Sequence, residues 1–139
     1  MIMALDLGTK RIGVAVADPG RTFALPVATI ERTNRRADLD AIKNYLEAYG
    51  VDELVVGEPL TLAGERGIAA HAMESFVDAL REIFSGTVHR VDERMTTAQA
   101  NKSLIAADVR GRKRRQVVDR VAAALILETF LARRRNARQ

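Results

Sequence analysis

Five acidic residues stand where their carboxylates could share a divalent cation. Asp6 and Glu58 lie at the ends of apolar segments, Asp92 and Glu93 follow a third such segment, and Asp119 lies in a helical pattern. Carboxylates held close together repel one another unless one is protonated or a cation lies between them. Oxygen ligands without His or Cys nearby favour Mg²⁺ or Mn²⁺. Two such ions about 4 Å apart would activate water for phosphodiester hydrolysis.

Taken singly, these acids also have ordinary structural interpretations. Asp6 precedes a glycine turn, where an Asp is often only a hydrogen-bond acceptor. Glu58 precedes a proline, which is typical of a solvated loop carboxylate. Asp92, Glu93 and Arg94 could form a surface ion pair after a strand. Their common position at the ends of apolar segments is what favours a shared metal site.

Asp119 falls beside the apolar stripe of a helix predicted over residues 116–134. Its ordinary interpretation is a pair with Arg115 or Arg120 within that helix. The small side chains at Ala122 and Ala123 would let the helix approach a sheet closely and bring Asp119 to the sheet edge. We assign the inner face of this helix to Val118, Val121, Ala122, Leu125 and Thr129.

Apolar runs and turn residues divide the chain into alternating elements. Strands are predicted over residues 1–7, 12–17, 24–30, 54–56 and 87–91. A first helix is predicted between a cap at Thr33-Asn34 and a stop at Gly50. Further helices are predicted around residues 73–84, 97–107 and 116–134, with a basic loop over residues 108–115. The first two strands lack polar alternation, which is typical of strands covered on both faces.

This order predicts a single α/β domain over residues 1–139 with a mixed five-stranded sheet. The first three strands form an antiparallel meander, and right-handed crossovers place the fourth strand beside the first and the fifth beyond it. The carboxyl ends of strands one, four and five then share one edge, where open α/β sheets bind ligands. Asp6, Glu58, Asp92 and Glu93 all fall at that edge.

The composition excludes several classes of site. The chain has no cysteine, which excludes disulfides and zinc–thiolate sites and fits a cytoplasmic location. No apolar run is long enough to span a bilayer, and the start of the chain does not have the pattern of a signal peptide. Aromatic residues make up 4% of the chain, so base stacking should not dominate nucleic-acid contacts.

Charge is unevenly distributed along the chain. Residues 1–101 hold 11 Lys/Arg against 15 Asp/Glu, whereas residues 102–139 hold 11 against 3. A basic end on an acidic body suits a polyanionic partner, although a solvated basic helix would give the same counts.

The chain resembles the RuvX/YqgF family of the ribonuclease H-like superfamily, whose members are described as Holliday junction resolvases and as nucleases of pre-16S ribosomal RNA. The motifs that carry the resemblance are ALDLGTKRIGVA at residues 4–15, VVGEPL at 55–60 with Gly64 and Gly67, DERMTT at 92–97, and Val118-Asp119 with Ala122-Ala123. The resemblance covers nearly the whole chain. It implies a ribonuclease H-like fold and a metal-dependent nuclease site of Asp6, Glu93 and Asp119. Glu58 departs from the family pattern, and could be a fourth ligand or a substitute for Glu93.

Basic residues surround the predicted acidic cluster. We expect them to contact phosphates, which positions a nucleic acid without reading its sequence. They are Lys10, Arg11, Arg94, Arg110, Arg112, Lys113, Arg114 and Arg115.

The residues thus predict a Mg²⁺- or Mn²⁺-dependent endonuclease of structured nucleic acid, and the family resemblance implies that it acts in maturation of the pre-16S rRNA 5′ end. A Holliday junction resolvase is the first alternative, and its paired cuts would require a homodimer. A non-catalytic RNA-binding factor in ribosome assembly is the second. A phosphotransferase is the third, because Asp-Leu-Gly-Thr at residues 6–9 is also found in actin-like ATPases, but the chain is too short for the second domain that such enzymes need.

Overall fold

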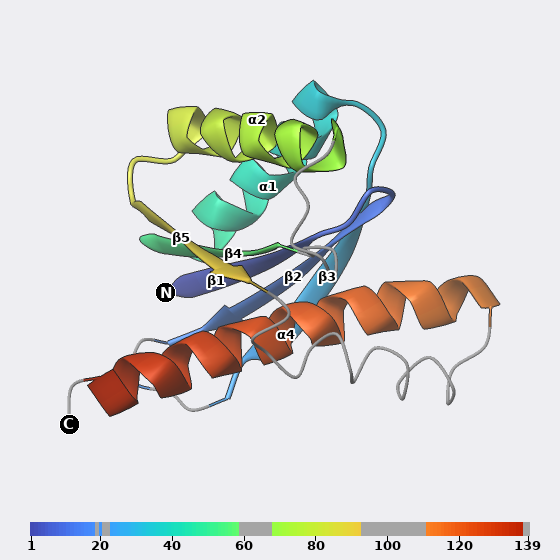
Figure 1. Cartoon of the computed structure of the whole chain (residues 1–139). Coiled ribbons are helices and arrows are strands. Elements are labelled where there is room, and N and C mark those ends of the chain that lie inside the picture. The colour runs from blue at the N-terminus through green and yellow to red at the C-terminus, as the bar shows by residue number, and fades with distance from the viewer. Residues whose placement is uncertain (19, 21–22, 59–67, 93–110, 138–139) are drawn as a thin grey trace.

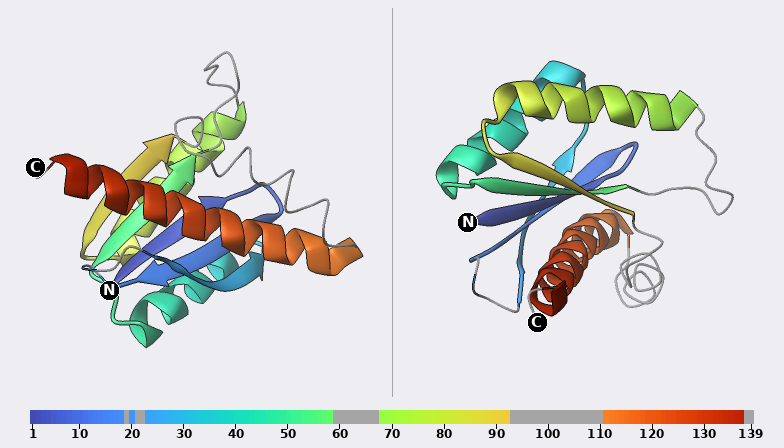
Figure 2. Two further views of the ribbon diagram at one scale, coloured as in Figure 1. Left: turned by 90° about the horizontal axis from the view of Figure 1, so that it is seen from below. Right: turned by 60° about the vertical axis from the view of Figure 1, so that its left-hand side comes forward.

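The computed structural model describes residues 1–18, 20, 23–58, 68–92 and 111–137. These residues form three layers, with helices α1 and α2 on one face of a sheet and helix α4 on the other (Figure 1). The views in Figure 2 show that, among the described elements, α4 crosses its face of the sheet alone.

The sheet has the predicted five strands in the order β3-β2-β1-β4-β5. Their bounds are β1 (Ile2–Leu7), β2 (Arg11–Ala17), β3 (Leu25–Glu31), β4 (Glu53–Glu58) and β5 (Thr87–Asp92). Strand β2 is antiparallel to β1 and β3, whereas β1, β4 and β5 are parallel. The predicted meander and both crossover positions are therefore confirmed, and β1 is the buried central strand.

Helices α1 (Arg35–Ala48) and α2 (Ile68–Ile83) cover the first face. Asn34 caps α1, since its side-chain oxygen accepts a hydrogen bond from the N–H of Ala37 at 2.9 Å. Gly50 ends it with a φ of +59°, a conformation that favours glycine. Both ends of α1 agree with the sequence prediction.

Alternate residues of β1 pack into two separate cores. Met3 and Leu5 face α1 and α2 and pack with Phe76 of α2. Ile2 and Ala4 face α4 (Gly111–Ala137). Because side chains alternate along a strand, Asp6 belongs to the same face as Ile2 and Ala4.

Helix α4 begins earlier than the sequence suggested. We expected a loop through residue 115 and a helix over residues 116–134, but the helix runs from Gly111 to Ala137. Residues 112–116 contain only Arg, Lys and Gln, which are good helix formers, and no residue there interrupts the helix. We predicted a loop because these residues are highly charged, but their high helix propensity makes them part of α4.

The buried face of α4 also differs from the prediction. Val118 and Ala122 are buried as expected, but Val121, Leu125 and Thr129 are only partly buried. From residue 117 onward, where the structure describes the side chains of α4, the other buried positions are Ala123, Ala124, Ile126, Leu127 and Leu131. Residues 121–127 are apolar on all sides, so helical periodicity alone could not fix the rotation of the helix.

Some predictions lie outside the described residues. These are the helix around residues 97–107 and the site residues Glu93, Arg94 and Arg110. Within the described ranges, none of the helices combines the length and apolarity needed to cross a bilayer.

Candidate active site at the carboxyl edge of the sheet

Asp6 is a buried acid near the carboxyl end of the central strand. Its side chain is 2% exposed, although the rest of its face of β1 is apolar. Its partners across the two neighbouring strands are Gly13 of β2 and Gly57 of β4. Both neighbours lack a side chain, so another element can approach the sheet closely at this point.

The space over the two glycines is filled by α4. A β-carbon at Gly13 would lie 1.9 Å from the carbonyl oxygen of Asp119, and one at Gly57 would lie 2.4 Å from Cδ1 of Ile126. Residues directly opposite in a sheet have β-carbons about 5 Å apart, so the Asp119 backbone lies next to Asp6. The predicted close approach of this helix to the sheet is confirmed.

Asp119 is held by a residue from the other end of the chain. Nε of Arg11 donates to Oδ2 of Asp119 at 2.7 Å, and the two side chains are 21% and 16% exposed. The ordinary interpretation of Asp119 was a pair with Arg115 or Arg120, and Arg11 was expected to contact a phosphate. The pair joins residues 108 positions apart, a separation that leaves no periodic signal in the sequence.

The backbone at the ends of β4 and β5 reaches the same edge. Glu58 is the register partner of Asp92, one position beyond the pair of Gly57 and Val91. The predicted meeting of strands one, four and five is thus confirmed for the main chain. The side chains of Glu58 and Asp92 lie outside what the structure describes.

Apart from Arg11, the predicted basic residues that the structure describes lie in two places. Lys10 is exposed in the turn between β1 and β2. The backbones of Arg112, Lys113, Arg114 and Arg115 occupy the start of α4, one to two turns before Asp119. The side chains of these four residues lie outside the described part of the structure.

A second polar network, which was not predicted from the sequence, lies at the opposite end of the parallel strands. Glu53 begins β4 and accepts hydrogen bonds from both Nη atoms of Arg134 in α4, one of them at 3.1 Å. Nε2 of His89 lies 2.9 Å from the same carboxylate. The guanidinium of Arg134 also stacks on Phe130.

This network anchors the far end of α4. The hydrogen bonds from Arg134 are the main reason why the pKa of Glu53 is lowered from 4.5 to about 2. Because α4 is one continuous helix, an anchor at Arg134 also restrains the position of Asp119.

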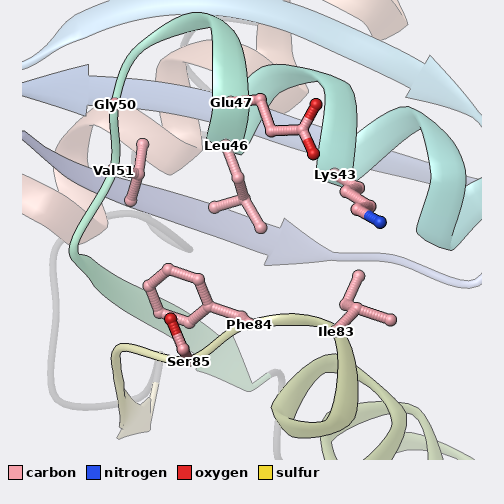
Figure 3. Close-up of a pocket in the computed structure, with 8 residues that line it drawn as sticks. All are labelled: Lys43, Leu46, Glu47, Gly50, Val51, Ile83, Phe84 and Ser85. Carbon is pink, nitrogen blue, oxygen red and sulfur yellow. The ribbon is translucent and has the colours of Figure 1, made fainter.

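A surface hollow of about 310 Å³ lies away from the acidic edge (Figure 3). Lys43 and Glu47 of α1 line one side, and Phe84 lines the other. Val51 and Ser85, which also line it, precede β4 and β5. The hollow is therefore at the amino end of the parallel strands and is not part of the Asp6 site.

The fold and the buried acid at the carboxyl edge define a class of protein, the ribonuclease H-like α/β proteins. The structure resembles that of "T. thermophilus RuvC in complex with Holliday junction substrate", with a TM-score of 0.54, 15% identity and 90% of each chain covered. At that identity, the likeness shows a shared fold.

The family model RuvX, described as "Holliday junction resolvase", matches residues 1–133, and the chain belongs to this family. A relative from Moorella thermoacetica, named "Putative pre-16S rRNA nuclease", is 47% identical over 95% of this chain and 94% of its own length. A relative of the same name from Geobacillus kaustophilus is 44% identical over 96% of this chain and 98% of its own length.

Proposed function

We propose that this chain is a divalent-metal-dependent nuclease that hydrolyses phosphodiester bonds in structured RNA, with the 5′ region of pre-16S rRNA as its substrate. The observation that carries the proposal is the buried Asp6 lying beside the part of α4 that bears Asp119. The names of relatives that match nearly the full chain support the choice of substrate. We propose further that residues 1–139 act as a single nuclease domain.

The residues present fit Mg²⁺ or Mn²⁺. Asp6 and Asp119 offer oxygen atoms, the donors that these ions prefer. We assign the third ligand to Glu93, which lies in the DERMTT motif at residues 92–97 that carries the family resemblance. Glu93 directly follows Asp92, whose backbone reaches this edge. Bound metal would supply an activated water and would stabilise the leaving oxygen.

The neighbouring basic groups then have distinct tasks. Arg11 orients Asp119 through the 2.7 Å contact to Oδ2 and so fixes the direction in which this carboxylate faces. Lys10 and the basic start of α4 would hold phosphates on either side of the acids. The low exposure of Asp6 would keep bulk water away from its carboxylate.

A Holliday junction resolvase is the second candidate. The description of the family and the shared fold with RuvC favour it. Paired cuts across a four-way junction require two active sites, so this candidate also requires a homodimer.

The test compares cleavage of three substrates over a titration of Mg²⁺ and Mn²⁺. The substrates are a pre-16S rRNA 5′ fragment, a four-way DNA junction and an unstructured RNA. We expect the wild type to cut the rRNA fragment only with metal. Asp6→Asn should abolish cleavage and leave binding within about threefold, because phosphate contacts supply most of the affinity. The matched control is Asp78→Asn, which replaces an exposed acid of α2, and this variant should cut at the wild-type rate.

Three outcomes would contradict the proposal. Asp6→Asn cutting at the wild-type rate would remove Asp6 from the site. Tight binding of RNA without metal-dependent cleavage of any substrate would favour the ribosome-assembly factor. Cleavage of the DNA junction alone would favour the resolvase.

A further inference from the structure

We propose that Arg32 is a positioning residue for the active site, because it fixes the turn that connects Asp6 to Arg11. The inference rests on the proposed nuclease function, and it concerns a residue that acts on the two acids through the main chain of this turn. Arg32 follows the end of β3 and precedes α1.

Arg32 binds both sides of the turn between β1 and β2. Nη1 of the Arg32 side chain donates to the carbonyl oxygen of Gly8 at 2.8 Å. The main-chain N–H of Arg32 donates to the carbonyl oxygen of Lys10 at 2.9 Å. The turn is closed by the N–H of Gly8, which donates to the carbonyl oxygen of Arg11 at 2.9 Å. A β-carbon at Gly8 would lie 2.6 Å from that oxygen, so the turn is tight as well as anchored.

The Arg32 side chain is itself held by two neighbours. Oδ2 of Asp38 accepts from Nε of Arg32 at 3.1 Å, and Oδ1 of the same carboxylate accepts from the N–H of Thr33 at 3.0 Å. Asp38 is 3% exposed, and a carboxylate so buried is costly unless it is paired. The centre of the Phe76 ring in α2 lies 4.8 Å from the guanidinium carbon.

These contacts connect the helical layer to the catalytic edge. Asp6 lies two residues before Gly8, and Arg11, which holds Asp119, directly follows Lys10. The position of both acids therefore depends on the path of one short turn, and Arg32 ties that turn to α1 and α2. A displacement of about 1 Å in such a site can cost on the order of 100-fold in rate.

The test measures kcat, KM and amide hydrogen exchange for Arg32→Gln and Asp38→Asn in the full chain. We expect Arg32→Gln to lower kcat roughly 10- to 100-fold while KM changes less than about threefold, because phosphate contacts remain. Exchange of the Gly8 amide, which donates to the carbonyl oxygen of Arg11, should accelerate. Asp38→Asn keeps one acceptor for Nε and should lower kcat less.

The matched control is Arg81→Gln, which removes an exposed arginine from α2 and should change neither kcat nor exchange in the turn. If Arg32→Gln does not fold, Arg32→Lys replaces it, because Lys keeps the charge but cannot bridge Gly8 and Asp38 at once. An unchanged kcat and an unchanged exchange rate in folded variants would overturn the proposal. If the wild type cuts no substrate, the proposed nuclease function has failed, and hydrogen exchange alone then tests the anchored turn. Exchange of the Gly8 amide that is slow in the wild type and faster in Arg32→Gln would still support the anchored turn. Exchange that is the same in both proteins would overturn it.

Discussion

A β-carbon added to Gly13 would lie 1.9 Å from the main-chain carbonyl oxygen of Asp119. The contact joins the backbone of β2 to the backbone of α4, so neither group can avoid it by changing a rotamer. Gly13 is also directly opposite Asp6 in the sheet. The missing side chain at Gly13 therefore sets how closely the helix that carries Asp119 approaches Asp6.

Gly13→Ala should destabilise the protein, because α4 must move away from β2 to admit a methyl group. Overpacking of this kind costs about 1–3 kcal/mol in the free energy of unfolding. Urea unfolding followed by circular dichroism measures the change. The same displacement should weaken Mn²⁺ binding, since it separates Asp6 from Asp119.

Two other glycines provide matched controls for this variant. At Gly57 the new methyl group would meet the Ile126 side chain, nearest at Cδ1, and a side chain can shift more readily than a backbone carbonyl, so Gly57→Ala should cost less than Gly13→Ala. At Gly20 no atom of the described residues lies within 4 Å of an added β-carbon, and Gly20→Ala should change stability by less than about 0.5 kcal/mol. Equal stability of all three variants would contradict the close packing of α4 on β2.

The contact between Arg11 and Asp119 should appear as a coupling free energy. Hydrogen bonds to charged groups contribute about 1.5–3 kcal/mol, and partial exposure of this pair lowers the expected coupling to about 1–2 kcal/mol. The measurement is a double-mutant cycle of Arg11→Gln and Asp119→Asn by urea unfolding.

The exposed pair of Arg81 and Asp78, with a 3.4 Å contact, is the control cycle. Its coupling should not exceed about 0.5 kcal/mol. If the cycle of Arg11 and Asp119 gave a value as small as this, the pair would not hold Asp119 in place.

Glu53 should make stability depend on pH in the acid range. Its pKa is lowered from 4.5 to about 2, mainly by hydrogen bonds from Arg134. A group whose pKa is lower in the folded protein stabilises it above the unfolded pKa. This contribution is therefore complete above about pH 4.5 and is lost as the pH falls toward about 2. Allowing for solvent screening, it amounts to roughly 1–2 kcal/mol.

The measurement is the free energy of unfolding of the wild type and Glu53→Gln between pH 2 and pH 6. The stability difference should be largest at pH 6 and should shrink as the pH falls below 4.5. Glu82→Gln replaces an exposed acid near the end of α2, and its free energy of unfolding should differ from that of the wild type by the same amount at every pH. A difference between wild type and Glu53→Gln that does not vary with pH would contradict the lowered pKa.

Most of the sheet and the place of Asp6 could be predicted from local patterns. Apolar runs without alternation identified β1 and β2, and the handedness of crossovers ordered β4 and β5. Asp6 could then be assigned to the carboxyl edge because strand position decides which edge a residue reaches.

The side-chain pairings could not be predicted in this way. Arg11 with Asp119 and Glu53 with Arg134 join positions 108 and 81 residues apart, and any Arg or Lys could have been the partner of either acid. The rotation of α4 was missed for a related reason. Its apolar residues surround the helix, and the choice of face was made by Gly13 and by Gly57 on the sheet.

The basic start of α4 should govern the salt dependence of nucleic-acid binding. Replacing Arg112, Lys113, Arg114 and Arg115 with Gln should weaken binding, because each bound phosphate releases counterions. The slope of log K against log salt should become shallower by about one for each phosphate that the variant no longer binds. Fluorescence anisotropy with labelled RNA at salt concentrations from about 50 to about 200 mM KCl measures the slope. Arg36→Gln on α1 is the control, and an unchanged slope in the fourfold variant would contradict the assignment.

The most direct test of the shared metal site is calorimetric titration of Mn²⁺ into the nucleic-acid-free protein. We predict that Asp6→Asn and Asp119→Asn each weaken Mn²⁺ binding at least about 10-fold, because each removes a negatively charged oxygen ligand. Asp78→Asn should bind as the wild type does. Wild-type affinity in both site variants would show that Asp6 and Asp119 do not share a cation.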